Sequence, residues 1–405
     1  MDAFECLACG PVATRDPHSP FCPGCGEPLF VAPPGPGRSF REDRALALEK
    51  FAEFLPLDRV DPRLSLGEGS TPLLRLGRAG AGLGRGGGVF AKNEAQNPTS
   101  SFKDRGTAVA VQKAVALGAK RIGTVSTGNM AASTAAYGAR AGLDTFVLLK
   151  EGTSLWSLRA AGIHSPRLVA VEGDYGAVFR ASAAIGRDLG IVFMNSIDPY
   201  RMEGYKLTAF EIFLQLGRRT PGRVFVPLSS GGHLLGLARG FDDLARAGLM
   251  DGYPTVVGVQ AAGCSPLADA FARGLARAER PAEVRTIAHA ISNPTPPAGN
   301  AVLRVIKERR GMIVAVTDEE MLEAQRELAA REGLFCQPES ATTLAALKKL
   351  AAPGNDGAPG ARGTGDDVLV LTGGGLKAPA ALESAPVAIH RMTLDGLAPG
   401  LARLV

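Results

Sequence analysis

The stretch KNEAQNPTSSFKDRGTAVAV, residues 92–111, joins a short apolar run to an apolar helix across a polar turn. Asn97-Pro98 is typical of a turn, and small hydroxyl residues fill 99–101. The run of Ala and Val that follows predicts a helix over 99–117, so Lys103 falls near a helix start. A solvent-facing lysine does not need such surroundings, and the residues around Lys103 therefore single it out.

Outward from this turn, short β-rich runs alternate with helical stretches of 10 to 15 residues, which is typical of βαβ units and parallel sheet. The runs are continuously apolar, as in strands covered on both faces. We therefore predict an α/β fold of open, mostly parallel sheets. The predicted strands are 89–93, 121–126, 144–150, 167–173, 223–228, 255–263, 311–317 and 367–375, and further helices are predicted at 130–142, 154–162 and 175–190. Gly-rich stretches at 78–88 and 352–367 predict surface loops.

The bulk composition is that of a soluble enzyme. The chain has 405 residues, which predicts two or three structural units. A net charge of +5 is too small for this length to indicate a nucleic-acid or membrane partner. No run approaches the roughly 20 apolar residues of a membrane span, and no signal peptide is apparent, so we expect a cytoplasmic protein.

Four cysteines near the N-terminus follow the spacing C-x2-C-x12-C-x2-C: Cys6, Cys9, Cys22 and Cys25. Paired knuckles at this spacing can place four thiolates tetrahedrally around zinc. Two disulfides are the competing interpretation, which a reducing cytosol opposes. We predict a zinc ribbon over residues 1–30, with a structural metal because four thiolates leave no open position. Among the charged residues of the ribbon, the acidic ones outnumber the basic ones, which is unsuited to nucleic acid.

Unusual residues cluster where predicted strands turn into helices, the edge at which parallel sheets bind ligands. At the first of these junctions, the dipole of the helix lowers the pKa of Lys103 and favours a neutral amine that can attack an aldehyde. A solvated lysine at a helix start is the competing interpretation.

Three further junctions carry polar groups. Ser126, Thr127, Gly128 and Asn129 follow the strand at 121–126 and suit a carboxylate or a ring oxygen, or else an ordinary helix cap. A phosphate is suited to the loop that opens the next helix: Ser229, Ser230, Gly231, Gly232 and His233. We expect His233 to contribute its backbone N–H as a donor, in preference to acting as a catalytic base. Thr372 ends the last strand and suits a ring nitrogen, or a plain tight turn. A lysine for an aldehyde, a phosphate loop, and partners for a ring nitrogen and a phenolic oxygen together match pyridoxal 5'-phosphate.

At these residues the sequence resembles the threonine synthases, which are fold-type II pyridoxal-phosphate enzymes. The matching segments are GEGSTPL (67–73), KNEAQNPTSSFKDRG (92–106), STGNMAAS (126–133), NSIDPYRMEGYKLTAFEI (195–212), GVQAAGCSPL (258–267), EGLFCQPESATTLAAL (332–347) and TGGGLKAP (372–379). An N-terminal zinc ribbon is also similar to some members.

The resemblance implies two α/β domains of the tryptophan synthase β type, with the cofactor between them. It places a large domain at 31–105 and 196–405, and a small substrate-side domain at 106–195. By resemblance, Lys103 is the Schiff-base lysine and catalytic residue, and Asn129 adjoins the 3-oxygen of the cofactor. Residues 229–233 hold its phosphate, Thr372 holds its pyridine nitrogen, and 126–128 receive the substrate carboxylate. Family members are often homodimers, so we expect one here.

The implied reaction converts O-phospho-L-homoserine and water into L-threonine and phosphate. Candidates for binding the substrate phosphate are Lys92, Arg105, Arg159 and Lys206, each of which has a structural charge as its competing interpretation. The chain departs from the family at Ser100, where glycine is usual, and at Gly374, where histidine is usual. Alternative functions are a threonine or serine dehydratase, a cysteate synthase, or a non-enzymatic zinc-ribbon protein.

Overall fold

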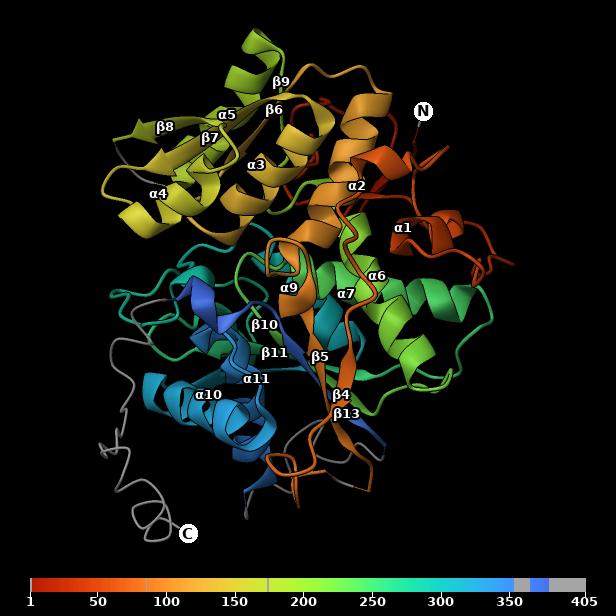
Figure 1. Cartoon of the computed structure of the whole chain (residues 1–405), viewed down its shortest axis with the longest axis vertical. Helices are drawn as coiled ribbons and strands as arrows, with labels where there is room; N and C mark the ends of the chain where they lie inside the picture. Colours follow the sequence, from red (N-terminus) through yellow and green to blue (C-terminus); the bar gives the residue numbers. More distant parts are fainter. Residues whose placement is uncertain (1, 85, 173–174, 353–364, 379–405) are drawn as a thin grey trace, which may run out of the picture.

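The computed structural model describes residues 2–84, 86–172, 175–352 and 365–378, which form three β-sheets with helices packed around them (Figure 1). The helices are α1 (Ala47–Lys50), α2 (Lys103–Ala116), α3 (Asn129–Ala141), α4 (Leu155–Gly162), α5 (Tyr175–Leu189), α6 (Pro199–Gln215), α7 (Gly232–Arg246), α8 (Pro266–Ala272), α9 (Gly299–Glu308), α10 (Asp318–Glu332) and α11 (Pro338–Ala351). Short 3-10 turns lie at Ala52–Phe54, Pro62–Leu64, Glu94–Gln96, His289–Ile291 and Gly375–Lys377.

The largest sheet has six strands in the order β12-β11-β10-β13-β5-β4. Its strands are β4 (Leu73–Arg75), β5 (Val89–Asn93), β10 (Arg223–Pro227), β11 (Thr255–Ala261), β12 (Met312–Val316) and β13 (Asp367–Leu371). All neighbours run parallel except β4, which pairs antiparallel with β5 at the edge. The helices α10 and α11 pack together, and α11 also lies against β10, β11, β12 and β13.

The second sheet has four parallel strands in the order β8-β7-β6-β9. They are β6 (Arg121–Val125), β7 (Asp144–Lys150), β8 (Arg167–Val171) and β9 (Ile191–Phe193), and α3, α4 and α5 lie around them (Figure 1). Every predicted strand is present, so the α/β architecture with mostly parallel sheets is confirmed. The predicted domain boundaries at residues 30, 105 and 195 stay predictions.

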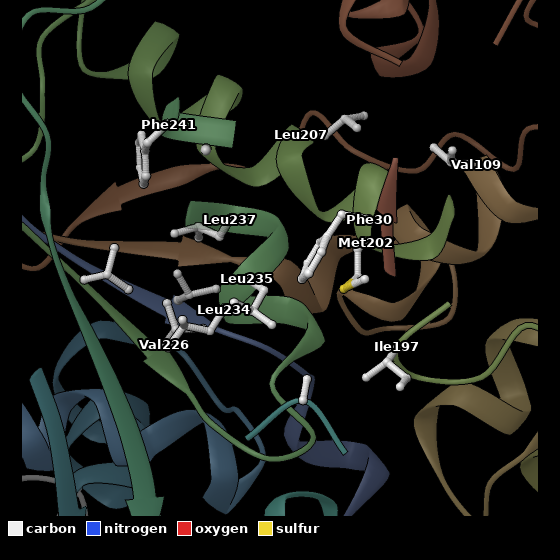
Figure 2. Close-up of a cluster of buried hydrophobic side chains, with 14 of the residues drawn as sticks. Phe30, Val109, Ile197, Met202, Leu207, Val226, Leu234, Leu235, Leu237 and Phe241 are labelled. Carbon is white, nitrogen blue, oxygen red and sulfur yellow. The ribbon is translucent and has the colours of Figure 1, made fainter. Parts of the chain in front are cut away.

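One continuous core joins these units (Figure 2). It contains Val109 of α2, Met202 of α6, Val226 of β10 and Leu234 of α7. The side chain of Phe30, from the N-terminal sheet, also lies in this cluster and is almost fully buried. The N-terminal sheet is antiparallel, with the order β2-β1-β3 and strands β1 (Phe4–Cys6), β2 (Gly10–Val12) and β3 (Leu29–Val31).

The start of α2 differs from the prediction. The helix begins at Lys103 rather than at residue 99. Ser100 has a φ of 57°, a left-handed conformation that a right-handed helix does not contain. Both the backbone N–H and the hydroxyl of Thr99 donate to the Asp104 carboxylate at 2.6 Å, which caps the turn before the helix. Lys103 is therefore the first helical residue.

Of the predicted surface loops, residues 78–84 and 86–88 lie outside helices and strands. The loop at 352–367 falls mostly outside the described residues. Among the described residues, we find no helix with the length and apolar character that crossing a membrane requires.

Candidate active site

A cavity of about 1150 Å³ lies at the carboxyl ends of strands from both large sheets. Its lining includes residues that follow β6, β7, β10 and β13, together with the starts of α2, α3, α7 and α11. This is where parallel α/β sheets bind ligands, and the volume is sufficient for a drug-sized molecule and a second small ligand. Residues predicted from four separate junctions meet in this one cavity: Lys103, Ser126, Thr127, Gly128, Asn129, Ser229, Ser230, Gly231, Gly232, His233 and Thr372.

Lys103 lies in the cavity wall at the first position of α2. Burial lowers the pKa of this lysine to about 7, and the positive charge of Arg201 contributes to the shift. The Lys103 Nζ lies 4.4 Å from the centroid of the Phe102 ring, and no carboxylate pairs with it among the described residues. The backbone of Phe102 donates to the Thr372 carbonyl at 3.0 Å, which ties the lysine to the end of β13. The result is a partly neutral amine held next to Thr372.

Asn129 is the first residue of α3, which follows the loop 126–128. Its Nδ2 donates to Gln337 Oε1 at 2.7 Å, a contact between helices of the two large sheets. Gly128 N–H donates to Ser126 Oγ at 3.3 Å, so the loop turns tightly at the end of β6. The first N–H groups of a helix have no partner within it, and those of α3 therefore suit an anion.

The loop 229–233 leads into α7, whose N-cap residue is Gly231. Gly231 has a φ of 97°, and a Cβ there would lie 2.8 Å from a Val302 methyl. A Cβ at Gly232 would lie 2.4 Å from the Ser196 carbonyl oxygen. Both positions therefore require glycine, and the backbone amides at the positive end of α7 are left open to a phosphate.

His233 is buried, and its ring stacks on Phe102 with centroids 3.8 Å apart. Burial, together with the charges of Lys103 and Arg105, holds the pKa of His233 well below its usual range, so the ring is neutral. Among the described residues, neither ring nitrogen has a hydrogen-bond partner. The side chain therefore supports the residue that precedes Lys103.

At the end of β13, the Thr372 hydroxyl lies 3.0 Å from Ser340 Oγ. Ser340 also accepts a hydrogen bond from the backbone of Gly373 at 3.0 Å. Thr372 lines the cavity, whereas Ser340 is fully buried behind it, so the Thr372 hydroxyl is the one suited to a ring nitrogen, since a hydroxyl both donates and accepts. Ser340 was not predicted, although it lies in the segment EGLFCQPESATTLAAL.

Three of the four basic residues expected at the substrate phosphate lie elsewhere. Lys92, Arg105 and Lys206 are fully buried, and none of them lines the cavity. Arg105 pairs with Glu94 at 2.6 Å and with Glu211 at 2.7 Å. The other pairs are Lys92–Glu211 at 2.6 Å, Lys206–Glu203 at 2.6 Å and Lys206–Asp243 at 2.8 Å. Their positions do not support the predicted role, because these cations are already neutralised by buried carboxylates.

Arg159, the fourth candidate, is exposed on α4, but the neighbouring Trp156 and Ala160 are the residues of this helix that line the cavity. Among the described residues, the lysines that do line it, apart from Lys103, are Lys150 at the end of β7 and Lys377 after β13, and His289 also belongs to the lining. Lys150 ends a predicted strand and so follows the strand-end rule that located the other residues. Lys377 lies in the 3-10 turn Gly375–Lys377 beyond β13, and only the tertiary structure brings it to the cavity.

The four N-terminal cysteines come together in the ribbon. Their Sγ atoms all lie within 4.8 Å of one another, and Cys6 Sγ is 3.5 Å from Cys25 Sγ. A tetrahedral zinc with bonds of about 2.3 Å separates its sulfurs by about 3.8 Å, which matches this cluster. All four cysteines are free thiols, so the disulfide alternative is not realised. Gly10 and Gly26, which follow the knuckles, both have positive φ, as their tight turns require.

Comparison with known proteins points to the family that the sequence resembles. Residues 64–371 match the family model described as "Pyridoxal-phosphate dependent enzyme". The threonine synthase of Methanocaldococcus jannaschii is 38% identical over 315 residues, which cover 77% of each chain. That of Methanosarcina acetivorans is 33% identical, covering 86% of this chain and 87% of the relative.

Solved structures share the fold. A threonine deaminase from T.th. superposes with a TM-score of 0.61 at 26% identity, over 79% of this chain and 94% of the other. Maize serine racemase gives a TM-score of 0.64 at 17% identity, over 82% and 92%. Cysteine synthase from Entamoeba histolytica gives 0.64 at 17% identity, over 86% and 97%. The last two establish the architecture alone.

Proposed function

Since the chain belongs to the family of pyridoxal-phosphate dependent enzymes, we propose that it is a threonine synthase that converts O-phospho-L-homoserine and water into L-threonine and phosphate. The observation that carries the proposal is the meeting of Lys103, Asn129, the loop 229–233 and Thr372 in one cavity. The relatives that span most of the chain are named threonine synthases, which supports this reaction over others of the family.

The residues of the cavity fit pyridoxal phosphate. In our proposal, the α7 amides of loop 229–233 hold its phosphate, where glycine is sterically required. The Thr372 hydroxyl, held by Ser340, faces the ring nitrogen, and Asn129 faces the ring oxygen. When bound, the cofactor withdraws electrons from the substrate Cα and so makes its proton acidic.

Lys103 is then the group that moves protons at the substrate. Its pKa of about 7 lets the amine both accept and release a proton near neutrality, as general acid–base catalysis requires. We propose that the loop 126–128, which leads into α3, binds the substrate carboxylate through backbone N–H groups. For the substrate phosphate we propose Lys377, because this residue lines the cavity and its Nζ, which donates to the Thr99 carbonyl, keeps further N–H donors for a ligand.

Assaying the purified protein with O-phospho-L-homoserine tests the function directly. We expect phosphate and L-threonine to be formed in equal amounts. A dehydratase would instead release 2-oxobutyrate from threonine without phosphate, a candidate favoured by the 26% identity to a threonine deaminase. Formation of 2-oxobutyrate without threonine synthesis would overturn the proposal.

We also propose that Cys6, Cys9, Cys22 and Cys25 bind a structural zinc ion, which rests on their clustered sulfurs. The expected homodimer stays a prediction.

A further inference from the structure

Gln337 and Asn129 form a hydrogen bond between the two halves of the cavity wall. Gln337 is the N-cap residue of α11, which packs on the six-stranded sheet, whereas Asn129 begins α3, which packs on β6 and β7. Asn129 Nδ2 donates to Gln337 Oε1 at 2.7 Å, and both residues line the cavity. Gln337 is only 9% exposed. This partly buried bond links the two sheets at the site itself.

Gln337 is itself held against the chain that follows Thr372. Its backbone N–H donates to the Gly373 carbonyl at 2.9 Å. A Cβ on Gly373 would lie 2.2 Å from Gln337 Oε1, so the amide occupies the space that any side chain at 373 would need. Gly373 therefore contacts Gln337 twice, through the backbone hydrogen bond and through the close approach to its side-chain amide.

This contact has a specific effect on Asn129. An asparagine amide has two N–H donors and one carbonyl acceptor, and it can rotate by a half-turn to exchange them. With Gln337 Oε1 as the acceptor, the bond uses one N–H and sets the Nδ2 end of the Asn129 amide as the donor. The other N–H has no partner among the described residues. It is available to an oxygen in the cavity.

We propose that Gln337 is a positioning residue that orients the Asn129 amide toward the ring oxygen of the cofactor. This inference rests on the proposed cofactor-binding role of the cavity. Gln337 acts through Asn129 and not on the reacting atoms. Its removal frees the Asn129 amide to rotate, so that the carbonyl faces the ring oxygen part of the time, which weakens binding and changes the protonation of the bound cofactor.

Three variants and one control test the assignment. Gln337→Met removes the acceptor and keeps the length, Gln337→Ser is a smaller replacement that leaves room for water, and Gln337→Glu retains an acceptor oxygen. Gln325→Met is the control, because Gln325 is also buried and donates to the Cys336 carbonyl at 2.7 Å but does not line the cavity. The measurements are the Kd for pyridoxal phosphate and the pH midpoint of the absorption change of the bound cofactor.

We expect Gln337→Met and Gln337→Ser to raise the Kd for pyridoxal phosphate about three- to tenfold, because each loses one neutral hydrogen bond. Both variants should also displace the pH midpoint of the absorption change. Gln337→Glu keeps an acceptor oxygen and should bring the Kd back toward the wild-type value, and Gln325→Met should lower thermal stability with the midpoint unchanged. An unchanged midpoint in whichever of the Met and Ser variants folds would overturn the inference. So would a Glu variant that behaves like the Met variant, since Gln337 would then be the donor. Failure of the wild-type protein to bind the cofactor is a separate result that overturns the proposed function as well.

Discussion

At the scale of single residues, the depressed pKa of Lys103 comes from burial more than from its helix. A fall from the usual value of 10.5 to about 7 corresponds to roughly 5 kcal/mol. An interaction with a helix terminus contributes only about 0.3–1 kcal/mol. The sequence placed the lysine at the helix end, but the cavity wall and the nearby charge of Arg201 set its protonation.

Replacing Lys103 with alanine should abolish turnover, because this removes the amine that directly follows Phe102. The backbone of Phe102 is tied to the end of β13, and no other described lysine of the cavity shares that position. The variant should also fail to retain pyridoxal phosphate after borohydride reduction, since the amine that the reduction would trap is missing. Mass spectrometry of the reduced protein measures this, with the reduced wild type as the control. Turnover by Lys103→Ala near the wild-type rate would contradict the assignment.

Covalent attachment of the cofactor to the apoprotein should depend on pH with a midpoint near 7. Only the neutral amine attacks an aldehyde, and its fraction rises as the pH passes the pKa of Lys103, which is about 7. The stability of the apoprotein should also rise with pH. The lysine of the unfolded chain holds its proton to higher pH than the buried one, so burial of Lys103 lowers the free energy of unfolding most below pH 7. The rate of absorbance change on adding cofactor measures attachment between about pH 6 and 9. A rate still rising roughly tenfold per unit above about pH 8 would show an ordinary lysine.

Lys377→Met should raise the KM for O-phospho-L-homoserine by about tenfold to a hundredfold, because it removes a hydrogen bond to the charged substrate phosphate. Burial lowers the pKa of Lys377, whereas Asp104 opposes the shift. Steady-state kinetics measure the change, with Lys307→Met as the control because Lys307 is exposed on α9 and outside the cavity. Equal KM values for the two variants would remove Lys377 from the phosphate site.

At the scale of elements, a buried ion network joins α2 to β5 and α6. Arg105 of α2 binds Glu94 after β5 and Glu211 of α6, and it donates to the Thr71 hydroxyl at 3.0 Å. The Glu211 carboxylate also accepts from the backbone of Ser70 at 2.7 Å. The segment GEGSTPL is thereby attached to the helix that carries Lys103.

Arg105→Met should lower the free energy of unfolding by about 3–5 kcal/mol, because it leaves the buried Glu94 without its cation and leaves Glu211 with Lys92 alone. Urea unfolding measures this, and Arg326→Met on the exposed face of α10 should change it by less than about 0.5 kcal/mol. If the folded Arg105 variant were as stable as wild type and showed only a raised KM for the substrate, the original phosphate-binding prediction would be correct.

At the scale of the whole molecule, the N-terminal ribbon contacts helices of both large sheets. Arg187 of α5 pairs with Asp16, and Arg239 of α7 pairs with Glu5 at 2.8 Å. Asn300 of α9 donates to Glu27 at 2.7 Å. The residue before α9, Ala298, donates its N–H to the Ser230 carbonyl at 3.2 Å. The ribbon therefore supports the surroundings of the cavity from outside.

Cys6→Ser should lose bound zinc and lower the Tm, since structural zinc contributes folding free energy. Metal analysis and calorimetry measure the two effects. The control is Cys264→Ser, a buried cysteine outside the cluster, which should keep full zinc. Full zinc content in the Cys6 variant would contradict a four-cysteine site.

The sequence by itself determined the strands of the two large sheets other than β4 and β9, the helices α2 to α5, and the junctions that carry Lys103, Asn129, residues 229–233 and Thr372. These follow from local patterns, because apolar periodicity and turn residues act over a few positions, and the carboxyl ends of parallel strands meet at one edge. The late start of α2 was missed because the left-handed Ser100 replaces the glycine that would have marked it.

Only the tertiary structure decided which charged residues face the cavity. Arg105 and Lys377 look alike in the sequence, yet Arg105 is neutralised by Glu211, which is 106 residues away, whereas Lys377 is left in the cavity wall. Gln337 could not be found from the sequence for the same reason, since Asn129 is 208 residues distant. A charge or an amide acquires its role from its partner, and partners so far apart are brought together by the packing of α2, α3, α6 and α11.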